Sequence, residues 1–343
     1  MEKLRILSRK SPAARPAISR KAAAGCIILA AILFLCFLDD FTPSGRVIPN
    51  YFKYVIVVSL IYSVASLGIN FYSGYQGDTS LGHAVFFGTG AYATAYLTTQ
   101  FSGIGFWISL LIGMLLSAVL SLPVAWAGSR VKGSFMVVIT YGYCEIFRYL
   151  AINSNVLGGT AGMAGVPSPK IFGVKLTKIP WLPSNKDGFI LILLAIVGFL
   201  AFFTYRIVNS RVGYALAAVR EDVIAAYAMG VNVKAYKRLA IITSAVITSV
   251  AGSFYAGFTN VADPSLFGAT LSITIFTMLV IGGRRSISGA ILGAFIVIIC
   301  PELLRYVQDL IGLPFDPWYI LYGLMLVIIM RFKPEGLLGT KKS

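Results

Sequence analysis

Residues 210–239 read SRVGYALAAVREDVIAAYAMGVNVKAYKRL and form the longest strongly polar insertion in the second half of an otherwise apolar chain. Apolar residues recur in this insertion at helical spacing, and Gly230 stands where a helix would end. The spacing predicts one helix over 213–229, about 25 Å long at the usual rise per residue. Five alanines keep this helix thin, so that another backbone can come close: Ala217, Ala218, Ala225, Ala226 and Ala228.

The insertion is also basic. Six Lys/Arg lie within 206–238, against two acids, Glu221 and Asp222. A helix of this kind lies outside the membrane, between two helices that span it. It is either an ordinary solvated connection or a docking helix that a cytoplasmic partner binds, and composition alone leaves both interpretations open.

The rest of the chain has the composition of a membrane protein. Of its 343 residues, 57% are hydrophobic types and 12% are charged, whereas soluble domains are about a quarter charged. We therefore expect an all-α, polytopic bundle of transmembrane helices. The formal net charge of +16 does not indicate nucleic-acid binding, because the basic residues gather at the ends of apolar segments, where membrane topology requires them.

About ten apolar segments are candidates for membrane spans, each of which needs roughly 20 residues. They are 22–38, 52–70, 80–99, 106–127, 134–152, 188–205, 239–258, 267–283, 287–304 and 318–331. A basic tail over 1–21 precedes the first span. Asp39 and Asp40 follow that span in place of a signal-peptide cleavage site, so we interpret it as a membrane helix. The transmembrane domain then covers 22–332, and a second tail covers 333–343.

The basic residues also predict an orientation. With the N-terminus in the cytoplasm, 21 of the 29 Lys/Arg fall on the inside, as the positive-inside rule requires. An even number of spans places both termini in the cytoplasm. The loop 206–238 is then cytoplasmic. Residues 153–187, which are rich in proline and glycine, form the one long external segment.

The chain offers little for catalysis or metal binding. Its four cysteines lie in apolar stretches without metal-ligand spacing, and His83 is its single histidine. It contains no Gly-x-x-x-x-Gly-Lys-Ser/Thr phosphate loop, so we expect no ATP hydrolysis by this chain itself. We predict no metal or cofactor, and the 13 scattered acids argue against a membrane enzyme. An ion-coupled secondary transporter or channel stays an alternative, because it would explain the spans without partners.

Residues 70–92 combine glycines with polar side chains. Glycines at 74, 77, 82, 88 and 90 indicate either a broken helix that lines a cavity or close helix packing through small residues. Candidates for the translocation pathway are Asn70, Ser80, His83 and Thr160. For His83 we favour a hydrogen-bonded packing role over a proton relay, and Asp78 fits the cytoplasmic interface.

A short pattern, E-x-x-R-Y, occurs twice near the predicted outer ends of spans. It places Glu145 three residues before Arg148, and Glu302 three residues before Arg305. Residues three apart share one helical face, so each pair can form an ion pair. Two short matches indicate coincidence more than an internal repeat.

Several segments resemble, in order, the signatures of LivM-type permeases of branched-chain amino acid ABC importers. They are NFYSGYQGDTSLGHAVFFGTGAY (70–92), FMVVITYGYCEIFRYL (135–150), GGTAGMAGVP (158–167), REDVIAAYAMGVNVKAYKRLA (220–240), GG-x-x-S-x-x-G-x-x-x-GA (282–294) and RFKPEGLLG (331–339). The resemblance covers most of the chain after about residue 50. Colinear motifs of this number are far more specific than any one glycine run.

The resemblance implies a permease subunit in a bacterial inner membrane, with no catalytic residues of its own. It implies a sister permease, two cytoplasmic ATP-binding subunits and an external solute-binding protein as partners, and import by alternating access. It also implies that the loop couples the chain to the ATP-binding subunits. The residues expected to make this coupling are Arg220, Glu221, Asp222, Ala225, Ala226, Met229 and Gly230.

The chain departs from the family pattern at a few positions. Permease loops of ABC importers usually read Glu-Ala-Ala, three residues, Gly, and here Ile224 replaces the Glu. Asp78 stands in a Gly-Gln-x-Ser motif, and Arg285 stands where a glycine is usual. These departures leave the family unaffected but put the solute in question, because related permeases carry urea or other small polar solutes.

Overall fold

The computed structural model describes residues 50–101, 103–131, 133–171, 174–176 and 186–311, and short pieces at 323–324, 327, 331–332 and 335–339. The predicted tail 1–21 and the first predicted span, 22–38, lie outside the described residues. The tenth predicted span, 318–331, lies mostly outside them. The other eight predicted spans each coincide with a helix.

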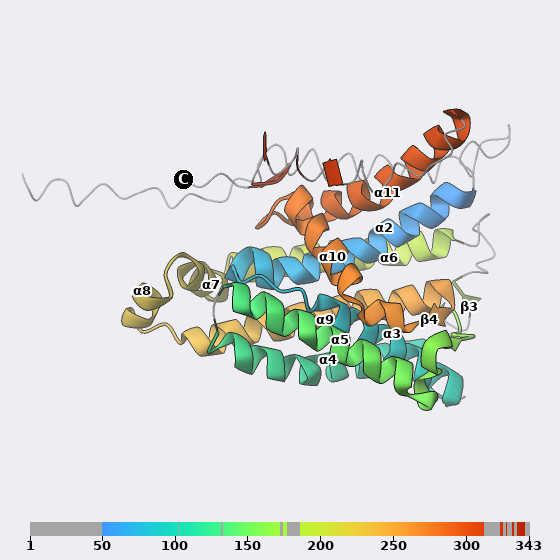
Figure 1. Cartoon of the computed structure of the whole chain (residues 1–343), viewed down its shortest axis with the longest axis horizontal. Helices are drawn as coiled ribbons and strands as arrows, with labels where there is room; N and C mark the ends of the chain where they lie inside the picture. Colours follow the sequence, from blue (N-terminus) through green and yellow to red (C-terminus); the bar gives the residue numbers. More distant parts are fainter. Residues whose placement is uncertain are drawn as a thin grey trace, which may run out of the picture.

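The described chain is almost entirely helical (Figure 1). The helices are α2 (Asn50–Ile69), η2 (Asn70–Gln76), α3 (His83–Gln100), α4 (Phe106–Gly128), α5 (Ser134–Asn153), η3 (Asn155–Leu157), η4 (Gly159–Ala161), α6 (Asp187–Val208), α7 (Arg211–Glu221), α8 (Val223–Ala228), α9 (Val233–Thr259), η5 (Pro264–Phe267), α10 (Ala269–Gly282) and α11 (Ile287–Ile311). Here η2 is a π-helix, and η3, η4 and η5 are 3-10 turns.

Two short antiparallel pairs of strands complete the described structure. The strand β1 (Met163–Ala164) pairs with β4 (Val261–Ala262), and β2 (Lys170–Ile171) pairs with β3 (Val174–Lys175). The pairing of β1 with β4 ties the segment after α5 to the connection between α9 and α10. The pairing therefore brings residues that are far apart in the sequence together at one end of the helical bundle.

Six of the described helices are long and apolar enough to cross a membrane. They are α2 continued by η2, and α4, α5, α6, α9 and α11. The helix α10 has only 14 residues, although the sequence predicted a span over 267–283. It ends at Gly283, whose backbone has φ 117°, outside the helical region. The predicted number of ten spans is therefore not established.

The helix α9 is the centre of the bundle, packed against α2, α3 and α4. Glycines let its backbone touch its neighbours directly. A Cβ added to Gly252 of α9 would lie 1.8 Å from the carbonyl oxygen of Phe87 in α3. A Cβ added to Gly90 of α3 would lie 2.0 Å from the carbonyl oxygen of Ser249. Of the two interpretations of the glycine run, close packing through small residues therefore holds for Gly90.

The helix α4 shows the same principle along its whole length. Small residues four apart form its buried face: Ser109, Gly113, Ser117 and Ser121. The Ser117 hydroxyl donates to the carbonyl oxygen of Ala245 in α9, 3.0 Å away. Large apolar side chains cover the opposite face and are exposed: Leu111, Leu115, Val119, Leu122 and Trp126. Small residues on the inner face and large apolar residues on the outer face suit a helix whose outer face contacts lipid or another membrane subunit.

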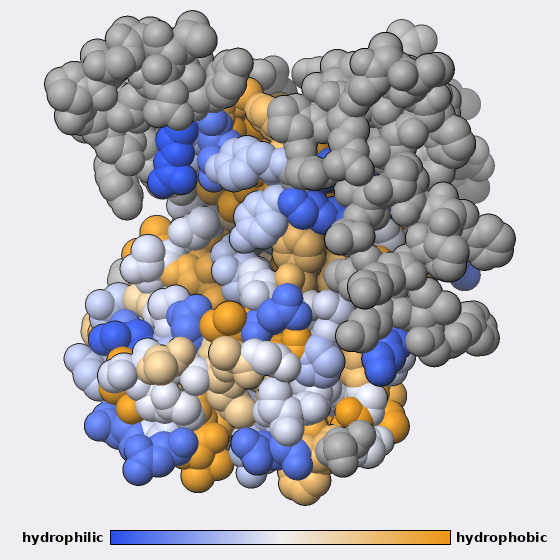
Figure 2. All heavy atoms as spheres, turned by 90° about the vertical axis from the view of Figure 1, so that its right-hand side faces the viewer, coloured by the Kyte–Doolittle hydropathy of each residue, from blue (hydrophilic) through white to orange (hydrophobic). Residues whose placement is uncertain are grey.

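The two ends of the bundle differ in what they carry. In Figure 1, α7 and α8 project from one end, whereas β3 and β4 lie at the other. Figure 2 looks onto the end with β3 and β4, where hydrophilic, neutral and apolar residues are intermixed over the described part. A mixed surface of this kind is typical of an end that contacts water.

Candidate functional site

The polar insertion forms two helices rather than one. The sequence predicted a continuous helix over 213–229, and this prediction is wrong: α7 ends at Glu221, and Asp222 is extended, with φ −153° and ψ 117°. The Asp222 carboxylate accepts from the backbone N–H groups of Ile224 (2.7 Å) and Ala225 (3.1 Å). Asp222 is therefore the N-cap of α8, because its side chain satisfies amides that lack helical partners.

The predicted end of this segment at Gly230 is confirmed. Gly230 has φ +81°, and its N–H donates to the carbonyl oxygen of Tyr227 (3.0 Å). The N–H of Val231 donates to the carbonyl oxygen of Ala226, also over 3.0 Å. This pair of bonds is a Schellman motif, in which glycine takes the left-handed position at no steric cost. The chain then turns sharply into α9.

The tip of the insertion is apolar and exposed. Ile224 and Tyr227 are each 76% exposed, and Met229 is 84% exposed. We call these three residues the α8 tip. Two of them, Ile224 and Tyr227, line a groove of about 760 Å³ together with Ser129 and Lys234. Exposed apolar groups gathered at one point commonly mark a protein contact. Ala225 and Glu221 are exposed as well, but Ala226 is buried against the chain itself.

Arg220 points inward, although the sequence analysis assigned it to contact with a partner. Its Nη1 donates to the carbonyl oxygen of Gly74 in η2 (3.1 Å). A Cβ on Gly77, which has φ +96°, would lie 2.6 Å from Cγ of Arg220. Burial, together with the nearby charges of Arg285 and Arg284, lowers the pKa of Arg220. The side chain is therefore packed into the membrane domain and joins α7 to η2.

A second link lies beside the first. Lys237 at the start of α9 forms an ion pair with Asp78 (Nζ to Oδ2, 2.8 Å) and reaches the carbonyl oxygen of Gly128 (3.4 Å). Gln76 also donates to the Asp78 carboxylate, over 2.7 Å. The sequence analysis placed Asp78 at the cytoplasmic interface but missed its partner. The two residues are 159 positions apart in the sequence, and they meet because the start of α9 lies against the connection between η2 and α3.

The predicted pathway residues Asn70, Ser80 and His83 are all fully buried and make hydrogen bonds. Asn70 donates to the carbonyl oxygen of Ser286 (3.2 Å) and accepts from the N–H of Arg285 (3.1 Å). The Ser80 hydroxyl accepts from the N–H of Gly82 (3.1 Å). The contacts of Asn70 tie η2 to the segment before α11, and the Ser80 contact lies in the connection between η2 and α3. A role of these residues in a pathway stays a prediction.

His83 is held by a defined hydrogen-bond chain. Its Nε2 lies 2.6 Å from the Ser244 hydroxyl, and that hydroxyl donates to the carbonyl oxygen of Gly68, also 2.6 Å away. Because the hydroxyl has one proton, Nε2 must be the protonated nitrogen of the ring. Nδ1 has no partner in the part of the chain that the structure describes. This geometry supports the packing role that the sequence analysis favoured.

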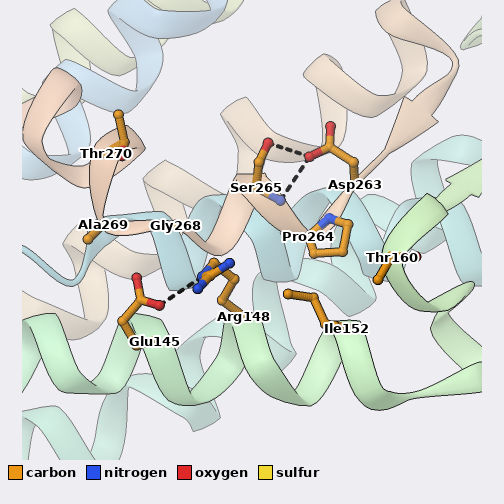
Figure 3. Close-up of a pocket in the computed structure, with 10 residues that line it drawn as sticks. All are labelled: Glu145, Arg148, Ile152, Thr160, Asp263, Pro264, Ser265, Gly268, Ala269 and Thr270. Atoms are coloured by element: carbon orange, nitrogen blue, oxygen red, sulfur yellow. Dashed lines mark hydrogen bonds and ion pairs between the residues drawn. The ribbon is translucent and has the colours of Figure 1, made fainter.

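The fourth predicted pathway residue, Thr160, lies elsewhere, at the end that carries β4 (Figure 3). It lines a cavity of about 490 Å³, which we call the outer pocket. The pocket residues come from α5, η4, η5 and the start of α10: Glu145, Arg148, Ile152, Thr160, Asp263, Pro264, Ser265, Gly268, Ala269 and Thr270. The structure thus separates Thr160 from the other three predicted residues.

Both predicted ion pairs of the E-x-x-R-Y pattern form. Arg148 Nε meets Glu145 Oε2 at 2.8 Å, inside the outer pocket. Arg305 meets Glu302 at 3.9 Å, on α11. The two pairs therefore share a pattern and differ in surroundings, because Glu302 and Arg305 are not among the residues that line the outer pocket.

The motif at the C-terminus packs onto the glycines that follow α10. The N–H groups of Leu337 and Leu338 donate to the carbonyl oxygens of Ile281 and Gly282, each over 2.9 Å. A Cβ on Gly283 would lie 2.4 Å from the backbone nitrogen of Gly339. Two of the sequence motifs, 282–294 and 331–339, are therefore one structural unit.

Comparison with known proteins accounts for these motifs together. Residues 51–330 match the family described as branched-chain amino acid transport system / permease component. The chain belongs to this family. This membership and the six apolar helices make the chain a multi-pass membrane permease, a transport subunit rather than an enzyme.

Individual relatives of this permease support the same conclusion. LivM of Escherichia coli, a high-affinity branched-chain amino acid transport system permease protein, is 28% identical over 94% of this chain and 77% of its own length. LivM of Salmonella typhimurium is 29% identical over 83% of this chain and 69% of its own length. A probable LivM of Methanocaldococcus jannaschii is 25% identical over 82% of this chain and 91% of its own length. No solved structure matches the chain.

Proposed function

We propose that this permease imports branched-chain amino acids across the cytoplasmic membrane as one subunit of an ATP-driven transporter. The observation that carries the proposal is the family match over 51–330, together with relatives named for branched-chain amino acid transport. The apolar interior is in keeping with leucine, isoleucine and valine as solutes. Affinity for the solute would come from an external binding protein, so the membrane pathway needs no deep site.

The proposed assembly contains a second permease and two cytoplasmic ATP-binding subunits. The chain is also 23% identical to LivH of Escherichia coli over 83% of its length, which supports a pair of related permeases. The exposed faces of α4 and α6 offer apolar surface for such a subunit or for lipid: Leu115, Val119, Phe199 and Phe202. With the N-terminus in the cytoplasm, as the basic residues predict, α7 and α8 face the cytoplasm and the outer pocket opens on the external side of the membrane.

The α8 tip is the proposed contact with an ATP-binding subunit. Closure of two such subunits would displace α8, and the displacement would pass inward through α7. Two contacts join α7 and the start of α9 to the end of η2 and the connection that follows it: Arg220 with Gly74, and Lys237 with Asp78. The mechanism is thus alternating access, driven from the α8 tip.

Reconstitution tests the proposal. The permease is placed in proteoliposomes with its genomic neighbours, the second permease, the ATP-binding subunits and the solute-binding protein. We expect uptake of leucine, isoleucine and valine that requires ATP inside the vesicles. Uptake of urea alone would retain the architecture and contradict the solute. Uptake by this chain without ATP-binding subunits would contradict the mechanism and favour an ion-coupled transporter.

A further inference from the structure

The outer pocket is a feature that the coupling mechanism leaves unused. It opens at the end opposite the α8 tip, between α5 on one side and η5 with the start of α10 on the other (Figures 1 and 3). Its volume, about 490 Å³, lies within the range of roughly 300–1,000 Å³ that small-molecule sites occupy. The lining residues include charged, polar and apolar side chains, so the pocket can distinguish ligands by charge and polarity.

Among the described residues that line the pocket, Arg148 is the one cation. In Figure 3, Arg148 rises from α5 toward Gly268 and Pro264 on the opposite wall. Only its Nε–H donates to Glu145 (2.8 Å), and the guanidinium also lies over the ring of Tyr149, 4.8 Å from the ring centroid. A guanidinium has five N–H donors, and its two terminal groups match the two oxygens of a carboxylate. Arg148 is therefore held in place and still able to bind an anion.

The pocket also presents anionic oxygens. One oxygen of Asp263 accepts from the backbone N–H of Ser265 (2.8 Å) and from the Ser265 hydroxyl. The other oxygen of Asp263 accepts no hydrogen bond from any residue in the described part of the chain. A carboxylate oxygen that lacks a donor is a good acceptor for an ammonium group. Glu145 lines the same cavity, where its carboxylate is paired with Arg148 and holds the guanidinium in place.

Glycines of the 158–167 motif build the wall that carries Asp263. A Cβ on Gly162, which has φ +72°, would lie 2.4 Å from the carbonyl oxygen of Ala262. A Cβ on Gly158, with φ +82°, would lie 2.0 Å from the carbonyl oxygen of Gly162. The turn η4 therefore packs directly against the residue before Asp263 and holds Thr160 at the pocket. The motif thus serves the pocket, a role that its sequence alone did not reveal.

We propose that the outer pocket binds a free α-amino acid as its zwitterion. Arg148 binds the carboxylate, Asp263 binds the ammonium group, and Ile152 and Pro264 contact an aliphatic side chain. This inference rests on the proposed function, because it treats the pocket as the place where solute first enters the permease. Urea lacks both charges and would gain little from this arrangement.

Thiol protection tests the site directly. Thr160→Cys is introduced into the complete importer in proteoliposomes, and its modification by a charged thiol reagent is measured above the background of the chain with Thr160 intact. Leucine, in large excess over the solute-binding protein, should slow this modification. Two analogues should not: 4-methylpentanoate, which lacks the ammonium group, and 3-methylbutylamine, which lacks the carboxylate. Thr270→Cys, on the opposite wall, provides a second probe if Thr160→Cys fails to assemble.

Arg148 has a matched control in the second E-x-x-R-Y pattern. Arg148→Gln should raise the leucine concentration for half-protection about tenfold or more, equivalent to about 1.4 kcal/mol. Arg305→Gln removes the same charge from a similar ion pair outside the pocket and should leave protection unchanged. Equal protection by leucine and both analogues, or equal effects of the two arginine variants, would overturn the site.

The outcomes separate this inference from the proposed function. Leucine uptake by the unmodified importer without protection at either cysteine would overturn the outer pocket as a solute site and leave the proposed function intact. Absence of uptake for all three branched-chain amino acids would instead contradict the proposed solute. Protection by leucine in that case would still support an amino-acid site, because the labelling does not depend on transport.

Discussion

The guanidinium of Arg220 donates a hydrogen bond to the backbone carbonyl oxygen of Gly74, 3.1 Å away and 146 residues earlier in the chain. The carbonyl belongs to the π-helix η2, with which the first described span ends, and the arginine belongs to the helix that leads to the α8 tip. Gly74 lies in the last turn of η2, where carbonyl groups lack partners within the helix. The helix that leads to the surface proposed to bind an ATP-binding subunit is therefore bonded to the end of the first described span.

Replacing Arg220 should uncouple the transporter. We expect Arg220→Ala to lower leucine uptake per ATP hydrolysed by about tenfold, since hydrogen bonds from charged groups contribute about 1.5–3 kcal/mol. ATP hydrolysis itself should continue. Arg211→Ala, an exposed position on the same helix, is the matched control and should behave as the unmodified chain. Unchanged coupling in Arg220→Ala would mean that the contact is only structural packing.

Gly230 should be sensitive to any side chain. Its φ of +81° is a left-handed conformation, which costs an L-residue about 1–2 kcal/mol. Gly230→Val should therefore distort the turn after α8 and reduce uptake, while the protein still inserts into the membrane. Gly198→Val is the control, because a Cβ at Gly198 meets no other atom within 4 Å. Normal uptake by Gly230→Val would contradict the role of the α8 tip, and so would normal uptake by Ala226→Arg.

The ion pair between Lys237 and Asp78 should matter for stability mainly because the loss of one partner leaves the other charge buried and unpaired. Side-chain exposure is 8% for Lys237 and 18% for Asp78, so removal of either partner leaves a largely buried charge. Lys237→Met alone should cost about 3–5 kcal/mol of stability, as broken buried pairs do. The double variant Lys237→Met, Asp78→Leu should recover much of this loss. A double-mutant cycle on thermal unfolding in detergent measures the coupling, and simple additivity would refute it.

The contact between α3 and α9 should tolerate no side chain at Gly252. A Cβ there would lie 1.8 Å from a backbone oxygen, and backbone cannot move aside as a side chain can. We expect Gly252→Val to destabilise the bundle by at least about 3 kcal/mol, the upper part of the range for overpacking. The amount of folded protein recovered by size-exclusion chromatography is the measurement. Gly142→Val, at an open position on α5, should be recovered like the unmodified chain, and equal recovery of both would argue against this packing.

Part of the site could be predicted from the sequence because its contacts join residues that are close to one another along the chain. The end of α8 at Gly230 and the pair between Glu145 and Arg148 are local, since each involves residues within one or two turns. The break at Asp222 was also local, and the signal for it existed: an aspartate before two free amides is a good N-cap. The even helical spacing around it concealed this signal.

Other features depend on contacts that no spacing encodes. His83 with Ser244, and Lys237 with Asp78, are separated by 161 and 159 residues. The first pair forms because α3 and α9 pack closely through glycines, and the second because the start of α9 lies against the connection between η2 and α3. The direction of Arg220 was hidden for the same reason, because Gly74 and Gly77, which it contacts, lie more than 140 positions earlier in the chain.

The sequence by itself determined the class of protein: apolar segments of membrane-spanning length, a basic loop between two of them, and colinear motifs that the family match confirms. These properties follow from composition and order, because hydrophobic length and charge position act on each segment separately. The tertiary structure alone decided which polar groups meet, that Arg220 faces inward, and that Arg148, Asp263 and Thr160 share one cavity. Such convergence arises when helices and turns from distant parts of the chain are packed against one another, and that packing is a property of the whole bundle.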